Sequence, residues 1–100
     1  MLTEEYVRTI LMDVIDPEMG VNIVDLGLIY DVGILGNDVH IKMTLTSPAC
    51  PAGPEIINNV KLAILKLKEV DSVDVELVWT PVWNTEMMDE DARDELMGFF

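Results

Sequence analysis

The chain has 100 residues, half of them apolar, which is enough to form the core of one domain spanning residues 1–100. Nineteen acids against six bases give a formal net charge of −13, and such a surface repels phosphate groups, which argues against nucleic acid and anionic membranes as partners. The apolar stretches are too short to span a membrane, the N-terminus is acidic and unlike a signal peptide, and the single cysteine excludes an internal disulfide, so we expect a cytoplasmic protein.

The first predicted element is a helix over residues 4–14, with Thr3 as its N-cap. Its core-facing residues recur at helical spacing: Val7, Ile10, Leu11 and Val14. Pro17 restricts the residue before it to extended geometry. The helix is therefore expected to stop near residue 15, and residues 16–22 to form a loop.

Two strands are predicted next, over residues 28–35 and 38–46, with Gly36 and Asn37 supplying a tight hairpin turn. Side chains of the second strand alternate in character. The core set is Val39, Ile41, Met43 and Leu45, and the solvent-facing set is His40, Lys42 and Thr44. One face of this hairpin is therefore expected to be exposed to solvent.

After a loop rich in proline and glycine, a second helix is predicted over residues 54–68, with Pro54 in its first turn. Its expected inner stripe consists of Ile57, Val60, Ile64 and Leu67. Leu62 and Leu65 fall off this stripe. They indicate a second apolar contact, and we take them as the basis of a homodimer hypothesis.

A third strand over residues 73–79 alternates apolar and polar side chains, and Pro81 closes it. Asp89 is positioned to cap a last helix that runs to Met97, with Gly98 as its stop signal. The order α-β-β-α-β-α predicts a two-layer α/β (α+β) sandwich with a small mixed three-stranded sheet. If the second and third strands lie parallel, their connection through the helix should be a right-handed crossover.

The single cysteine, Cys50, lies where the second strand ends and the second helix begins. Unpaired N–H groups at a helix start favour a thiolate, the form that attacks electrophiles and binds metals, whereas nearby carboxylates oppose it. Three interpretations are open: a reactive thiol, a ligand for metal or sulfur, or a buried core residue. The surrounding prolines and hydroxyls favour a functional role.

Three loops are expected to converge at one end of the sheet. They carry Asp16 and Glu18, then Thr46, Ser47 and Cys50, then Trp79, Pro81 and Trp83. The two acids are candidate ligands or a general acid/base pair, with solvated turn acids as the alternative. Thr46 and Ser47 suit capping of the second helix or holding of its entry loop, and the tryptophans suit a core or rim position.

His40, the only histidine, is expected on the wet strand face, which disfavours a Cys–His dyad. The sequence also lacks a C-x-x-C pair and a phosphate-cradling glycine loop. Dithiol exchange and nucleotide hydrolysis of those types are therefore not indicated.

Several motifs occur in an order that resembles one known family. They are residues 16–18 (DPE), 24–31 (VDLGLIYD), 43–51 (MTLTSPACP), 75–83 (VELVWTPVW) and the ending at 88–98. This set, spread over nearly the whole chain, resembles the metal-sulfur cluster biosynthetic family, the SufT/PaaD-like iron–sulfur assembly proteins. The chain lacks the cysteine-rich C-terminal segment of the PaaD branch, which is tied to maturation of a phenylacetate oxygenase, and the nucleotide-binding domain of other relatives.

The resemblance implies a non-enzymatic accessory factor in assembly of iron–sulfur clusters or their delivery to client proteins. It places Cys50 at the cluster or sulfur contact, in a cleft supported by Asp16, Glu18, Thr46 and Ser47. Clusters are usually held by four thiolates, so one thiol cannot retain a cluster alone. We therefore expect no stably bound cofactor, only a transient cluster or iron, with assembly proteins and client apoproteins as partners.

Two alternatives from other functional classes stay open. One is a thiol-dependent enzyme that uses Cys50 with a carboxylate, although the sequence shows no suitable histidine or oxyanion loop. The other is a protein-interaction adaptor whose cysteine is structural, including one that serves maturation of a phenylacetate-type oxygenase.

Overall fold

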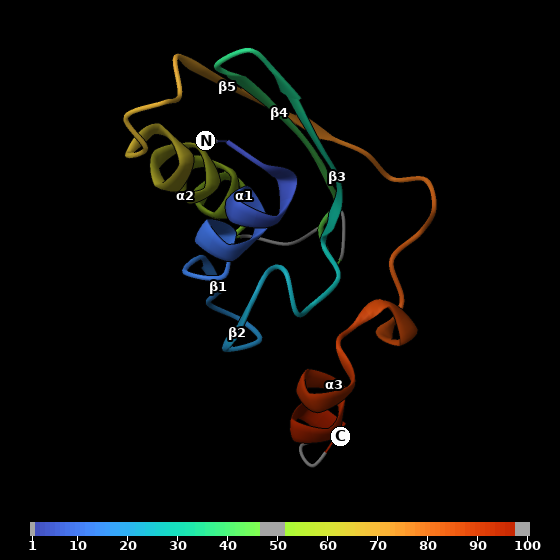
Figure 1. Ribbon diagram of the computed structural model, residues 1–100. Helices are drawn as coiled ribbons and strands as arrows, with labels where there is room; N and C mark the ends of the chain where they lie inside the picture. The colour runs from blue at the N-terminus through green and yellow to red at the C-terminus, as the bar shows by residue number, and fades with distance from the viewer. Residues whose placement is uncertain (1, 47–51, 98–100) are drawn as a thin grey trace.

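A computed structural model describes residues 2–46 and 52–97 of the chain. Two helices cover one face of a small sheet, and the last helix projects beyond that sandwich (Figure 1). The elements in chain order are α1 (Glu4–Leu11), β1 (Ile15–Asp16), β2 (Val21–Asn22), β3 (Ile29–Leu35), β4 (Asp38–Met43), α2 (Gly53–Leu65), β5 (Ser72–Leu77), the 3₁₀ helix η1 (Thr85–Met87) and α3 (Glu90–Met97).

The main sheet has the strand order β3-β4-β5. Strand β4 pairs antiparallel with β3 and parallel with β5, and α2 makes the crossover between the two parallel strands. The predicted mixed three-stranded sheet and two-layer α/β architecture are therefore confirmed. The inner face of β4 carries Val39, Ile41 and Met43, each at most 1% exposed, which join residues of α1 and α2 in one apolar cluster.

Helix α1 begins as predicted, because the Thr3 hydroxyl accepts a hydrogen bond from the backbone N–H of Tyr6 (3.0 Å). It ends at Leu11, three residues before the predicted end. The N–H of Val14 donates to the carbonyl of Leu11 in a tight turn, and the Val14 carbonyl accepts from Ile23 (both 3.0 Å). Val14 therefore belongs to the connection, although it is buried as expected.

The predicted loop over residues 16–22 contains a second, two-stranded sheet, so its assignment as a plain loop is wrong. Ile15 and Asp16 pair antiparallel with Val21 and Asn22. The hairpin closes because the N–H of Gly20, at φ +70°, donates to the Asp16 carbonyl (2.8 Å). A ladder of two residues is too short to produce a readable alternation of apolar side chains.

Both sheet strands that lead toward the candidate site end earlier than predicted. Strand β4 stops at Met43, and Thr44, expected to be wet, is fully buried with its N–H donating to the Leu28 carbonyl (2.9 Å). Strand β5 stops at Leu77, after which the Val78 N–H still reaches the Met43 carbonyl (2.8 Å). Single backbone hydrogen bonds thus continue the pairing for one residue past each strand, without a regular ladder.

Helix α2 spans Gly53–Leu65 with Pro54 in its first turn, so the predicted end at residue 68 is three residues too late. Its N-cap is Ala52, so the capping role expected for Thr46 or Ser47 is wrong, and a role in the entry loop stays a prediction. The fully buried stripe is Ile56, Val60 and Ile64, whereas the predicted Ile57 and Leu67 are only partly buried. The i, i+4 spacing of the buried set faces the sheet.

The C-terminal segment is held against residues 22–30. The Trp83 indole N–H donates to the Leu26 carbonyl (2.7 Å), and the Asp89 N–H donates to the Asp25 carbonyl (2.6 Å). Asp89 also caps α3 as predicted, since its carboxylate accepts from the N–H of Asp91 (3.2 Å). The predicted stop at residue 98 lies outside the described residues. None of the helices in the described ranges has the length and apolar character needed to span a bilayer.

The backbone of this segment comes very close to Gly27, which has φ +77°. A Cβ atom there would overlap the backbone carbonyl of Met87. We expect Gly27→Ala to lower the free energy of unfolding by about 3 kcal/mol or more, measured by urea denaturation, since both left-handed strain and a backbone clash oppose it. Gly20→Ala is the matched control: φ is +70° but the space is open, so the strain of about 1 kcal/mol acts alone. Equal effects of the two substitutions would contradict this account.

Candidate functional site

The connection that contains Cys50 and Ser47 lies outside the described residues, so the accessibility of the thiol stays a prediction. The structure places both ends of that connection. Thr46, half-buried, follows the end of β4, and Ala52, buried, begins α2. Leu45 contacts Gly53, where an added Cβ would lie 2.8 Å from a Leu45 methyl carbon. The end of the strand and the start of the helix are therefore packed together on either side of the cysteine connection.

A small cavity of about 140 Å³ lies beside Thr46. Its lining combines two of the three predicted loops: Leu45, Thr46, Trp79, Val82 and Trp83. Trp79 is 40% exposed and Val82 is 78% exposed, so an apolar rim faces solvent next to the cysteine connection. The tryptophans are rim and partly buried aromatics, as the sequence indicated, and the indole of Trp83 is anchored by its bond to Leu26.

The Asp16 turn has a different local environment. Asp16 is 1% exposed, and its carboxylate accepts a hydrogen bond from the backbone N–H of Glu18 (2.9 Å). The alternative of a solvated turn acid is therefore wrong for Asp16, although Glu18 itself is exposed. Within the described residues, neither acid lines the cavity beside Thr46. Convergence of this turn with the other two loops stays a prediction.

Asp25 holds the next turn through reciprocal bonds with Asn22. The Asn22 amide donates to the Asp25 carboxylate, and the Asp25 N–H donates to the Asn22 side-chain oxygen (both 2.9 Å). Since the Asp25 carbonyl also accepts from Asp89, this residue positions the C-terminal segment that forms the cavity wall. Asp25 therefore has a structural role in the described part of the chain.

Tyr30 helps to hold the segment around Pro81, a role that the sequence did not indicate. Its hydroxyl donates to the Pro81 carbonyl (2.8 Å) and lies 3.4 Å from the Met87 sulfur. Desolvation raises the pKa of Tyr30, and a hydrogen bond with Thr44 opposes that shift. A bulge between Ile29 and Asp31 turns this side chain out of the regular alternation, so no period-2 pattern could have found it.

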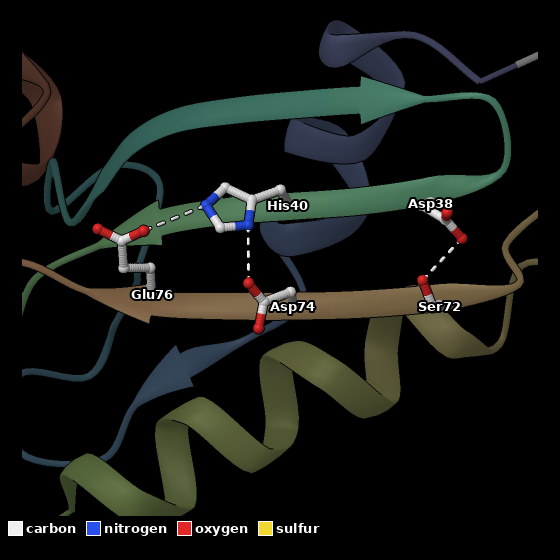
Figure 2. A network of polar contacts seen from close by, with 5 residues as sticks. All are labelled: Asp38, His40, Ser72, Asp74 and Glu76. Atoms are coloured by element: carbon white, nitrogen blue, oxygen red, sulfur yellow. Dashed lines mark hydrogen bonds and ion pairs between the residues drawn. The ribbon is translucent and has the colours of Figure 1, made fainter.

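His40 lies on the outer face of the sheet, as predicted, and is 40% exposed on its side chain. Figure 2 shows its ring between two carboxylates of β5, with Nδ1 2.8 Å from Asp74 and Nε2 3.4 Å from Glu76. It does not line the cavity beside Thr46. Among the described residues, no group of three or more histidine, cysteine or acidic side chains is arranged to hold a metal ion.

Comparison with known proteins shows which family this chain matches. Residues 4–77 match the model of the iron-sulfur cluster assembly protein family. The chain is 46% identical over 99 residues to a Porphyromonas gingivalis protein named Fe-S protein maturation auxiliary factor, covering 97% of this chain and 92% of that one. It is 44% identical over 81 residues to the Staphylococcus aureus Fe-S protein maturation auxiliary factor SufT, covering 80% and 92%.

The solved DUF59 domain of unknown function from Bacillus anthracis superposes with a TM-score of 0.89 at 41% identity, over 94% of this chain and 91% of that one. The PaaD-like side of the resemblance is represented by an Escherichia coli protein named as one component of a putative 1,2-phenylacetyl-CoA epoxidase, 34% identical over 91 residues. That match covers 90% of this chain but only 54% of the Escherichia coli protein. The predicted resemblance is confirmed: this chain belongs to the iron-sulfur cluster assembly protein family.

Proposed function

We propose that the protein is an accessory factor that helps deliver iron–sulfur clusters to client apoproteins in the cytoplasm, acting through Cys50. One observation carries this proposal: the only cysteine of a chain in the iron-sulfur assembly family sits between Thr46, at the cavity rim, and the first turn of α2. Relatives named as Fe-S protein maturation auxiliary factors support the same role.

The start of α2 suits a sulfur ligand. Its N-cap is Ala52, whose methyl side chain cannot accept a hydrogen bond from the first-turn N–H groups. A thirteen-residue helix directs the positive end of its dipole at the preceding connection. We infer that these groups favour the thiolate of Cys50, the form that binds iron or exchanges with a cluster.

The number of thiolate ligands favours delivery of a cluster over its storage. Iron–sulfur clusters are usually held by four thiolates, and this chain supplies one. The cluster is therefore cargo, shared with an assembly protein, a client or a small thiol during transfer. Such a factor performs no catalysis of its own and retains no resident cofactor.

The exposed rim of Val82 and Trp79 provides the client contact in this proposal. An apolar rim beside a polar connection excludes water from a docked partner and leaves the sulfur position accessible. Asp16, Glu18, Thr46 and Ser47 form the acidic, hydroxyl-rich support of the cleft. Because one Asp16 oxygen accepts the Glu18 N–H, Asp16 contributes through its charge and through the turn that it closes.

Cys50→Ser tests the central claim. In a strain lacking the protein and grown under iron limitation, we expect the wild type to restore aconitase-type activity and Cys50→Ser to fail at equal protein abundance. On anaerobic reconstitution with iron and sulfide, the variant should also lose the cluster absorbance that the wild type develops. Full complementation by Cys50→Ser would favour the adaptor alternative. Loss of complementation without any cluster absorbance in the wild type would favour a thiol enzyme.

Substitutions of Asp16 distinguish the effect of its carboxylate charge from its role in closing the turn. Asp16→Asn keeps a side-chain oxygen for the Glu18 N–H, so we expect a change in unfolding free energy below about 1 kcal/mol, whereas Asp16→Ala should cost about 1–3 kcal/mol. If the carboxylate charge supports the cleft, Asp16→Asn should lower complementation despite its stable fold. Wild-type complementation by Asp16→Asn would restrict this residue to the turn.

The rim is tested by Val82→Asp. Since Val82 is 78% exposed, the unfolding free energy of the variant should stay within about 0.5 kcal/mol of the wild-type value. Client maturation should fall. Leu35→Asp is the matched control, because Leu35 is 82% exposed at the end of β3 in the β3–β4 hairpin and outside the cavity. Equal loss of maturation in both variants would contradict a specific contact at the rim.

A further inference from the structure

A groove of about 680 Å³ lies between the C-terminal parts of α1 and α2, away from the cavity beside Thr46. Its apolar lining includes Ile10, Val14, Ile15, Leu62, Leu65 and Leu67. Ile15, Leu62 and Leu65 are each about half exposed, at 48%, 50% and 49%. This helical face therefore presents both protruding apolar side chains and a hollow large enough to receive them.

The charges of the molecule are unevenly distributed around this face. Residues 4–13 and 53–69 hold four of the six basic residues, Arg8, Lys61, Lys66 and Lys68. The same segments hold five of the nineteen acids, Glu4, Glu5, Asp13, Glu55 and Glu69. Nearly all of the net charge of −13 therefore lies elsewhere, and a second strongly acidic molecule is repelled least at the helical face.

We propose that this face binds the same face of a second copy of the chain, forming a two-fold symmetric dimer. A two-fold interface pairs a surface with itself, so projections must meet hollows and any charge must meet an opposite charge. The groove meets both conditions, because Asp13 and Lys66 both line it along with the apolar side chains. In the dimer, Leu65 enters the opposite groove and Asp13 faces the partner subunit's Lys66.

The dimer surface uses the C-terminal part of α2, although its Ile15 neighbours Asp16 in β1. The groove contacts α2 from Asn59 onward, whereas Cys50 precedes the helix start at Gly53. Leu62 is nine residues from that start, about 14 Å along the helix axis. Pairing through the groove therefore uses a part of α2 away from its first turn, and a failure to dimerise would leave the proposed role of Cys50 standing.

Sedimentation velocity over a concentration series, in moderate salt to screen the overall repulsion, measures the association. We expect a monomer–dimer equilibrium for the wild type and a dissociation constant at least about 30-fold weaker for Leu65→Glu, as for loss of a central interface side chain. The control Leu35→Glu places the same charge on an exposed hairpin leucine and should leave the equilibrium unchanged. Cys50→Ser should dimerise like the wild type.

Charge reversal tests the register. Asp13→Lys and Lys66→Glu should each weaken self-association, because each places like charges in both symmetric contacts. An equimolar mixture of the two variants should recover the dimer, since both contacts then pair opposite charges between copies. A wild type that stays monomeric throughout, a dimer insensitive to Leu65→Glu, or a mixture no tighter than either variant alone would overturn the proposal.

Discussion

Strand β4 is the element on which the rest of the structure depends. It is hydrogen-bonded on both edges, antiparallel to β3 and parallel to β5, and its inner side chains are sealed beneath the two helices. The parallel pairing requires the chain to leave β4, pass through α2 and return. The cysteine connection is the first part of that crossover, so its two ends are held by the best-buried strand and by a helix packed on it.

The wall of the candidate site is built by the far end of the chain. Residues after β5 turn back toward residues 22–30, where carbonyl groups of Asp25 and Leu26 accept hydrogen bonds from Asp89 and Trp83. Gly27 lets the Met87 backbone approach without a side chain between them. This docking sets the tryptophan segment beside Thr46, so a turn near residue 25 indirectly shapes the surroundings of the cysteine connection.

The two faces of the sandwich differ in chemistry. The outer sheet face carries His40 between Asp74 and Glu76, polar groups that satisfy one another at the surface (Figure 2). The helical face is richer in bases and bears an apolar groove. A molecule with this distribution can keep an acidic, solvated sheet surface while using its helical layer and its cavity rim for contacts with other proteins.

Local sequence alone determined much of this protein. The Thr3 cap, the Gly36–Asn37 turn and the Asp89 cap depend on groups close in the chain, and each was predicted correctly, as was the alternation from Val39 to Met43. The ordered motifs likewise indicate the family from the sequence alone. Element ends were less predictable, because the last backbone bonds of a helix or strand, such as those of Val14, Thr44 and Val78, depend on which other segment lies beside it.

The tertiary structure decided what surrounds the candidate site. Burial of the Asp16 carboxylate, the bond from Tyr30 to Pro81 and the anchoring of Trp83 on Leu26 all join segments or environments that no local pattern encodes. The same holds for the groove, because it exists only where α1 and α2 pack side by side. Periodicity reports which face of one element is apolar, whereas a site depends on which elements meet, and that is set by the packing of the whole chain.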